Sequence, residues 1–147
     1  MSTDMIHPFT ADDLEKIFKT SSHSNEHVEF TVRKISDDRL IGFVSLFDLN
    51  IRNHSCELGI GIAKSEDRAK GYGTEILNLI LDYGFNNVNM HKIKLNVYPF
   101  NTGAIKAYTR VDFVKETTFK QEVFYNGQRI DINQSVIFQN DWYAMQK

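Results

Sequence analysis

One short stretch between a predicted strand and a predicted helix decides the fold: Arg68-Ala69-Lys70-Gly71-Tyr72-Gly73-Thr74. Before it, the segment Glu-Leu-Gly-Ile-Gly-Ile-Ala at 57–63 predicts a strand with internal glycines, where a ligand or another backbone can come close. After it, residues 71–87 carry a wide apolar face at helical spacing. A glycine turn that opens a helix presents free N–H groups and the positive end of the helix dipole. It can therefore bind an anion such as a diphosphate.

Three kinds of nucleotide site use such a turn. A dinucleotide fingerprint needs a third glycine where this chain has Ile76, and a Walker loop needs Gly-Lys-Ser/Thr where this chain has Gly-Tyr-Gly-Thr. A coenzyme A diphosphate site remains, beside the interpretation that the turn is only a glycine-rich helix start without a ligand. Arg68 and Lys70 add positive charge to the turn.

The pattern on both sides of the turn predicts alternating strands and helices. Period-two alternation predicts a strand at 28–33, and the same or a continuous apolar pattern predicts strands at 39–49, 92–98, 113–125 and 129–138. Thr10 can cap a first helix, and Asn101 can cap a short helix that runs to about residue 109. Asn126-Gly127 predicts a tight hairpin turn between the last two strands.

Composition excludes several classes of protein. The chain has 147 residues, 41% of them apolar, and a formal net charge of -2, which gives no overall attraction to nucleic acid or to an anionic membrane. No apolar run approaches the roughly 18 residues of a membrane span, and no secretory signal opens the chain. A single cysteine favours the reducing cytoplasm, and the histidines show no metal-binding spacing. We therefore expect a soluble, cytoplasmic protein with no metal, nucleic-acid or membrane partner.

Two motifs resemble those of the GNAT acyltransferase superfamily. Arg68-x-x-Gly71-x-Gly73 is similar to the family's Arg/Gln-x-x-Gly-x-Gly/Ala signature, between a strand and a helix as in the family. The second motif is Asn101-x-x-Ala104-Ile105-x-x-Tyr108-x-x-x-x-Phe113. The end of the chain resembles the branch that contains ribosomal-protein Nα-acetyltransferases and bacterial spermidine N-acetyltransferases. The resemblance covers about residues 28–142.

The resemblance implies an α/β (α+β) fold. It consists of a mixed, mostly antiparallel, twisted sheet with flanking helices, in which the parallel strands 57–63 and 92–98 splay apart at the centre. Residues 1–147 would form one acetyltransferase-like domain, shortened at its N-terminus. Its expected parts are an N-terminal helix and loop (10–27), antiparallel strands (28–63), an acyl-CoA-binding core (64–110) and a C-terminal hairpin and tail (111–147).

The resemblance also implies acetyl-CoA as co-substrate. The backbone of Ile60, Gly61 and Ile62 would pair with the pantetheine arm, and a bulge at Gly59 and Gly61 would free an N–H for the thioester oxygen. Asn101 would contact the pantetheine or order the splay while it caps its helix, and Ala104 belongs to the same segment. The diphosphate would lie on the turn made of Arg68, Ala69, Lys70, Gly71, Tyr72, Gly73 and Thr74.

Tyr108 corresponds to the family's tyrosine near the coenzyme A sulfur, and it would protonate the leaving thiolate. Glu57 is the candidate general base, directly or through water. Tyr108 could instead be only a packed aromatic side chain, and Glu57 only a solvated charge at the end of a strand. Asp48 and His54 are second choices for binding the amine. Cys56 is interpreted as a small buried residue, so transfer is expected to be direct, in a ternary complex.

The predicted function is acetyl-CoA-dependent N-acetylation of a primary amine, with a polyamine and a protein N-terminus as competing acceptors. Another small amine, such as an aminoglycoside, stays open, and the alternative is a non-catalytic acyl-CoA-binding module. Two features depart from the family. Asp112 stands before Phe113 where the family has Gly, and only nine residues precede Thr10. The shortened front would expose a sheet edge, which favours a homo-oligomer.

Overall fold

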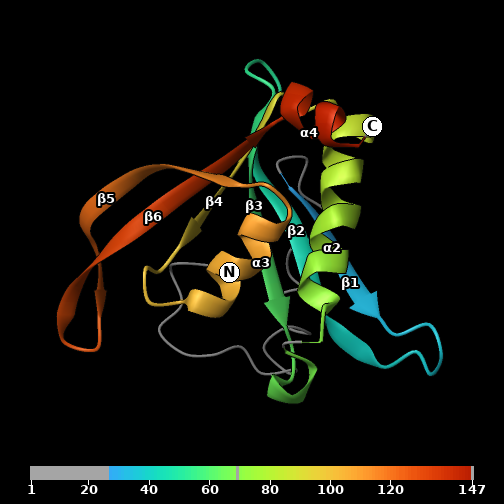
Figure 1. Cartoon of the computed structure of the whole chain (residues 1–147), viewed down its shortest axis with the longest axis horizontal. Helices are drawn as coiled ribbons and strands as arrows, with labels where there is room; N and C mark the ends of the chain where they lie inside the picture. Colours follow the sequence, from blue (N-terminus) through green and yellow to red (C-terminus); the bar gives the residue numbers. More distant parts are fainter. Residues whose placement is uncertain (1–26, 69, 147) are drawn as a thin grey trace.

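The computed structural model describes residues 27–68 and 70–146. The helix expected from Thr10 and the loop that follows it lie outside these residues. The described chain forms one twisted sheet with helices packed against it (Figure 1).

The sheet has the strand order β1-β2-β3-β4-β6-β5. The strands are β1 (Val28–Arg33), β2 (Leu40–Asn50), β3 (Ser55–Ile62), β4 (Lys92–Val97), β5 (Val114–Tyr125) and β6 (Gln128–Phe138). All neighbours pair antiparallel except β3 and β4, which pair parallel. The expected mixed sheet with one central parallel pair is confirmed, and each predicted strand lies within two residues of the observed one.

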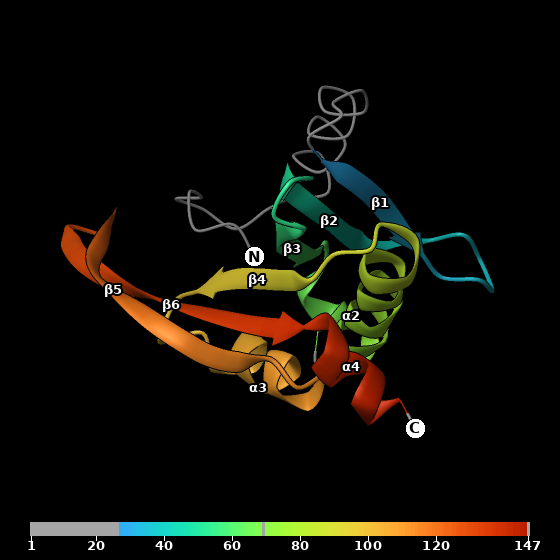
Figure 2. The ribbon, with the colours of Figure 1, turned by 90° about the horizontal axis from the view of Figure 1, so that it is seen from above.

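The helices are η1 (Ser65–Asp67), α2 (Tyr72–Asp82), η2 (Tyr83–Asn87), α3 (Thr102–Arg110) and α4 (Gln139–Met145). The helix expected at 71–87 is present, but its last part, η2, is a π-helix. The sequence did not predict α4. This helix begins after Phe138 without a side-chain cap, so it lacks the usual start signal. Figure 2 shows α2, α3 and α4 on the same side of the sheet.

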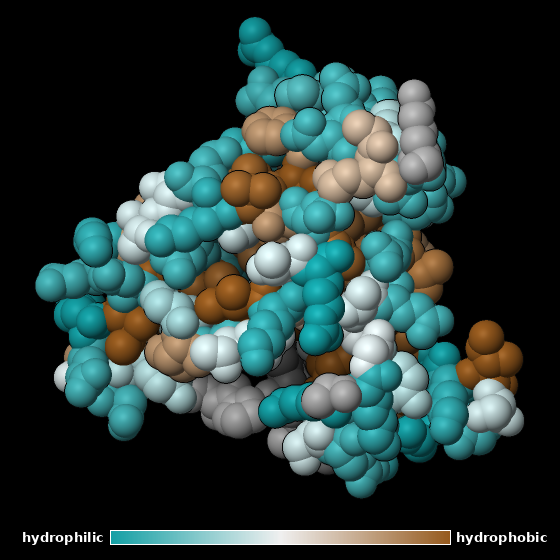
Figure 3. Space-filling view, in the orientation of Figure 1, coloured by the Kyte–Doolittle hydropathy of each residue, from teal (hydrophilic) through white to brown (hydrophobic). Residues whose placement is uncertain are grey.

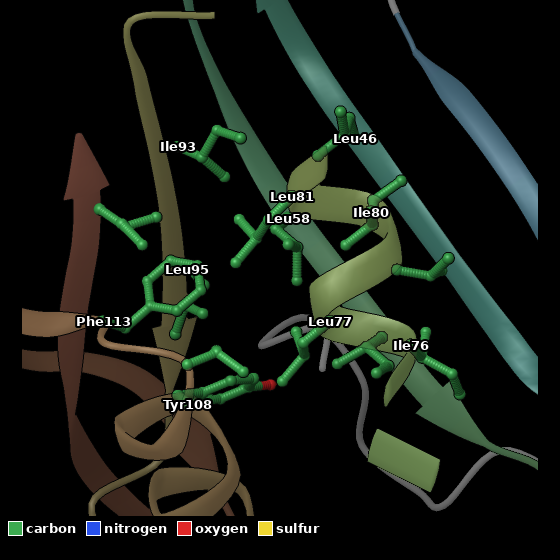
Figure 4. Close-up of a cluster of buried hydrophobic side chains, with 14 of the residues drawn as sticks. Leu46, Leu58, Ile76, Leu77, Ile80, Leu81, Ile93, Leu95, Tyr108 and Phe113 are labelled. Carbon is green, nitrogen blue, oxygen red and sulfur yellow. The ribbon is translucent and has the colours of Figure 1, made fainter. Parts of the chain in front are cut away.

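The core lies between that side of the sheet and α2 (Figure 4). Leu46 and Leu58 from the sheet meet Leu77 and Leu81 of α2, and each of the four is at most 2% exposed. Burying one such side chain stabilises the fold by roughly 1.5–3 kcal/mol. Tyr108 of α3 lies in the same cluster, so the core fixes α3 against α2.

Two turns have the backbone geometry that the sequence predicts. Asn126 (φ 49°) and Gly127 (φ 76°) both lie in the left-handed region, as a tight hairpin turn requires. Asp112 also has positive φ (72°), and aspartate tolerates this conformation better than most residues. The aspartate at this position is therefore compatible with the fold.

The face shown in Figure 3 is mainly hydrophilic, with scattered apolar patches. Among the helices of the described residues, none is long and apolar enough to cross a membrane.

Candidate active site

The central parallel pair is joined over only a short length. β3 and β4 pair from Ser55↔Lys92 to Glu57↔Lys94, and the pairing stops there. Beyond it the strands diverge toward their C-terminal ends, and α3 lies over the opening in Figure 1. The expected splay is thus present and begins directly after Glu57.

The splay leaves one edge of β3 without a strand beside it. Ala63 N–H donates to Ile41 O on β2 at 2.8 Å, and in an antiparallel ladder alternate residues bond to the same neighbour. Gly61 therefore turns its backbone groups toward β2, whereas Ile60 and Ile62 turn theirs toward the opening. Of the three residues expected to pair with pantetheine, Ile60 and Ile62 have the right orientation, and Gly61 does not.

The expected bulge at Gly59 and Gly61 is absent, so that prediction was wrong. The β2–β3 register runs unbroken from Phe47↔Glu57 to Gly42↔Ile62, and it shifts only between Phe47 and Asn50. The glycines serve packing instead. A Cβ on Gly61 would lie 2.3 Å from Cε1 of Phe43, and one on Gly59 would lie 3.2 Å from Oγ of Ser45.

The glycine turn lies at the open end of the splay and leads into α2. Gly71 is the N-cap residue with φ 82°, a conformation that suits glycine, and it gives the helix no side-chain cap. A Cβ on Gly71 or Gly73 would meet nothing within 4 Å, so neither glycine is required for packing. Arg68 and Lys70 are exposed. Ala69 lies outside the described residues.

The first turn of α2 has the properties of an anion site. The N–H groups of Tyr72, Gly73 and Thr74 belong to the first turn, where a helix has no internal acceptors for them. The helix dipole places partial positive charge at the same point. The turn and the open edge of β3 together fit a diphosphate that continues into an extended amide-containing arm, as in coenzyme A.

Asn101 caps α3, as predicted. Its Oδ1 accepts a hydrogen bond from the backbone N–H of Ala104 at 3.2 Å. Asn101 is half-buried and follows β4 by a short turn, so it lies at the same end of the splay as the glycine turn. The cap thus fixes the start of the helix that carries Tyr108.

Tyr108 is 3% exposed, and its ring meets Phe113 edge-on with centroids 6.0 Å apart. In Figure 4 its hydroxyl points toward Leu77 of α2. Burial raises the pKa of the Tyr108 phenol above its ordinary value, so the hydroxyl stays protonated at neutral pH. The side chain is a packed aromatic with a protonated hydroxyl, held on the helix side of the splay.

Glu57 is held by two residues that the sequence analysis did not select. Asn96 Nδ2 of β4 donates to Glu57 Oε1 at 2.9 Å, and Gln134 Nε2 of β6 donates to Asn96 Oδ1 at 3.2 Å. All three side chains are half-buried. In the sequence, Asn96 alternates with buried residues, and this pattern could have placed it on the polar face of the strand beside Glu57. No sequence pattern could have identified Gln134, because its partner on β4 is far away in the sequence.

The two second-choice residues differ in their surroundings. Asp48 is exposed, with φ 51°, at the irregularity that follows Phe47, and Phe47 pairs with Glu57. His54 Nδ1 lies 3.1 Å from Asn89 O, and His54 O accepts hydrogen bonds from the backbone N–H groups of His91 and Lys92. His54 therefore joins two loops at the start of β3, and the structure does not bring it into contact with Glu57.

Tyr108 and Glu57 lie on opposite faces of the sheet. Leu58 is in the core cluster with Tyr108, and Glu57, the next residue along β3, points to the other side. Among the described residues, no β3–β4 backbone pair separates the two faces beyond Glu57. An acyl group in this gap could meet a proton donor from the helix face and a carboxylate from the other.

Comparison with known proteins agrees with this geometry. Residues 2–114 match the Acetyltransferase (GNAT) domain family. The chain belongs to the GNAT acetyltransferase family. It is accordingly an acetyl-CoA-dependent N-acetyltransferase, and acetyl-CoA is its co-substrate.

Individual GNAT proteins are similar over most of the chain. Spermidine N(1)-acetyltransferase of Vibrio cholerae is 34% identical over 131 residues, which are 89% of this chain and 75% of that protein. The structure of the spermidine N-acetyltransferase from Vibrio cholerae in complex with CoA and spermine matches with a TM-score of 0.80 at 33% identity, over 90% of this chain and 77% of that one. A dodecameric structure of the Vibrio cholerae enzyme matches with a TM-score of 0.81 at 32% identity, over 92% and 78%.

Proposed function

We propose that the chain transfers the acetyl group of acetyl-CoA to a primary amine of an aliphatic polyamine. The observation that carries this proposal is the similarity to a spermidine acetyltransferase and to a structure that contains CoA and spermine. The half-buried Glu57 carboxylate beside the splay supports it, because a cationic amine needs an anionic partner and a proton acceptor.

The donor would lie along the open edge of β3. The backbone groups of Ile60 and Ile62 would pair with the pantetheine amides, and Asn101 and Ala104 would border the arm from α3. The diphosphate would lie on the turn from Arg68 through Ala69, Lys70, Gly71, Tyr72 and Gly73 to Thr74. Free N–H groups and exposed cationic side chains are the donors that a diphosphate requires.

The reaction is a direct displacement. Glu57 accepts a proton from the bound ammonium, directly or through water, and frees the nitrogen lone pair. The amine nitrogen then forms a bond to the acetyl carbon, and the bond between carbon and sulfur breaks. Tyr108 donates a proton or hydrogen bond to the sulfur that leaves. The nitrogen loses its second proton to water as the amide forms, Tyr108 regains a proton from water, and Glu57 releases the proton that it accepted. The products are an N-acetylated amine, coenzyme A and one proton.

Asn96 gives Glu57 a defined orientation in this scheme. Because Gln134 donates to the amide oxygen of Asn96, the Asn96 NH₂ group is the part that faces Glu57. The bond from Asn96 thus holds Oε1 of the Glu57 carboxylate in a defined position. Asp48 could bind a second ammonium of a polyamine from its exposed position near the same strand end, whereas His54 supports the scaffold.

The first experiment measures thiol release from acetyl-CoA with spermidine, spermine, a short diamine and a peptide with a free N-terminus. Turnover with the polyamines supports the proposal. Turnover with the peptide alone would replace the acceptor by a protein N-terminus, and absence of turnover with every amine would contradict both.

A second experiment tests the role of Tyr108. Tyr108→Phe should bind CoA with the wild-type dissociation constant and lose about 100-fold in kcat, because general acid catalysis contributes about this much. Tyr143→Phe is the matched control. Tyr143 lies on α4, where its hydroxyl donates a hydrogen bond to Phe85 O at 3.1 Å, far from the proposed reaction site. Wild-type kcat in Tyr108→Phe would remove the assignment.

We also infer a homo-oligomer in the cytoplasm. β1 is an edge strand of the described sheet and carries the partly exposed Phe30, and exposed edges favour pairing with another chain. The Vibrio cholerae relative forms a dodecamer. The use of a single cysteine in the chain supports a reducing compartment. Light scattering that shows only monomer at micromolar concentration would contradict the oligomer.

A further inference from the structure

Asp67 is the one charged side chain that is buried in the part of the chain the structure describes, at 1% exposed. It ends η1, immediately before the glycine turn begins at Arg68. Arg39, which precedes β2, holds it with both ends of its guanidinium: Nη1 lies 2.6 Å from Asp67 Oδ2, and Nη2 lies 3.0 Å from Oδ1. This two-bond geometry fixes orientation as well as distance.

The ion pair connects η1 to a distant part of the chain, whereas the backbone hydrogen bonds of η1 join residues that are close in the sequence. Asp67 N–H donates to Lys64 O, and Arg68 N–H donates to Ser65 O. The pair with Arg39 instead connects η1 to the β1–β2 hairpin, 28 residues away in sequence. The pair therefore fixes the residue that directly precedes the glycine turn.

Two physical effects follow from this placement. The pair limits the positions that the turn can adopt before a ligand arrives, which lowers the entropic cost of binding. It also neutralises a buried carboxylate beside the place where the diphosphate would lie. Without Arg39, that carboxylate would be a buried, unpaired negative charge next to an anionic ligand.

We propose that Arg39 and Asp67 are positioning residues for the glycine turn, and that they set the affinity for the diphosphate of acetyl-CoA. This inference rests on the proposed function only in placing the diphosphate on that turn. Neither residue touches the reacting atoms.

The test compares two acetyl donors in Arg39→Ala. For acetyl-CoA, KM should rise about tenfold while kcat stays within about twofold, the size expected when hydrogen bonds between charged groups are lost. For S-acetylpantetheine, which lacks the diphosphate, kcat/KM should not change. A merely structural role would lower activity with both donors.

Arg33→Ala is the matched control. Arg33 lies in the same hairpin, and its Nη1 donates only to the backbone oxygen of Asp38 at 3.1 Å among the bonds described. Its KM for acetyl-CoA should equal that of the wild type. Arg39→Lys keeps the charge without the two-bond geometry and should give an intermediate KM, which also serves if Arg39→Ala folds poorly.

The double variant Arg39→Ala/Asp67→Asn separates the two effects. It should recover part of the affinity that Arg39→Ala loses, because no unpaired carboxylate remains. Unchanged KM in Arg39→Ala and Arg39→Lys, or equal losses with both donors, would overturn the inference. If no amine acceptor supports turnover, the proposed function fails, but calorimetric CoA binding by wild type and Arg39→Ala still tests the pair. Absence of CoA binding to the wild type would contradict both.

Discussion

Asn96 Nδ2 donates a hydrogen bond to Glu57 Oε1 at 2.9 Å, and this bond joins β4 to β3 at the point where their ladder ends. A side-chain bond thus takes over where the backbone bonds stop. It spans the start of the opening and fixes the carboxylate that we assign as the base. Gln134 extends the chain of bonds to β6.

We expect Asn96→Ala to lower kcat about tenfold and to leave the KM for acetyl-CoA near the wild-type value. The carboxylate would lose its fixed orientation, while the donor would keep its backbone and glycine-turn contacts. Steady-state kinetics at saturating acceptor would measure this. Asn86→Ala is the control, because exposed Asn86 bonds only to Asp82 on α2 among the bonds described. Wild-type kcat in Asn96→Ala would show that the bond from Asn96 does not orient Glu57 for catalysis.

Gly73→Ala should lower neither the stability of the fold nor the affinity for the donor. An added Cβ would meet nothing within 4 Å, and alanine in a helix is favoured over glycine by about 1 kcal/mol, so the free energy of unfolding should not fall. The GNAT signature has alanine as well as glycine at this position, so the methyl group should leave room for the diphosphate, and the KM for acetyl-CoA should stay near the wild-type value.

Urea unfolding and the KM for acetyl-CoA, measured on the same Gly73→Ala preparation, test both halves. Gly103→Ala in α3 provides the reference for the gain in helix propensity, because its Cβ would also meet nothing within 4 Å. A KM raised about tenfold in Gly73→Ala would contradict a diphosphate bound as the family signature implies.

Gly61→Ala should destabilise the fold, because its Cβ would lie 2.3 Å from Cε1 of Phe43. Overpacking of this kind costs about 1–3 kcal/mol. Phe43→Leu in the same chain would remove the clashing ring edge, so the double variant should be more stable than the Gly61→Ala single variant. Additive losses across the double-mutant cycle would show that the two residues do not compete for space.

Cys56 should make stability depend on alkaline pH. Burial raises the pKa of its thiol from 9.0 to about 12, with a smaller contribution from Glu57, and Lys94 opposes the change. The folded state therefore keeps a proton that the unfolded state loses, and the contribution of the thiol to stability falls as pH rises from about 9 toward 12.

The comparison with Cys56→Ala isolates this effect. Any excess stability of the wild type over the variant at pH 8 should shrink by about 1 kcal/mol at pH 10, because the variant has no thiol to titrate. Turnover per folded molecule should be unchanged in the variant. A constant stability difference would contradict the buried thiol, and loss of turnover would point to a covalent acyl-cysteine.

Features set by local chemistry were predictable from the sequence. The Asn126-Gly127 turn, the Asn101 cap and the alternation in β4 depend on residues close together in the chain, and all three are observed. Features set by registers between distant strands were not. Gln134 meets Asn96 only because β4 pairs with β6, and no local pattern encodes that register.

The glycines of β3 illustrate why a correct pattern can still be misinterpreted. A glycine within a strand indicates a bulge or a close approach, and the sequence does not distinguish the two. Here the neighbouring strand contributes Phe43, whose ring occupies the space above Gly61. The helix α4 was missed for a related reason, because it is held by the packing of Trp142 on Phe85, with ring centroids 5.4 Å apart, rather than by a start signal.

The short β3–β4 ladder has a mechanical consequence. The sheet consists of two antiparallel halves, β1-β2-β3 and β4-β6-β5. Only three residue pairs between β3 and β4 join the backbones of the two halves. So short a ladder resists relative twisting of the two halves less than a full ladder would. Acetyl-CoA bound along the open edge would contact both halves and restrict their relative motion, so that binding the donor makes the enzyme more rigid. Bound acetyl-CoA would then be a structural part of the sheet that holds it for the reaction.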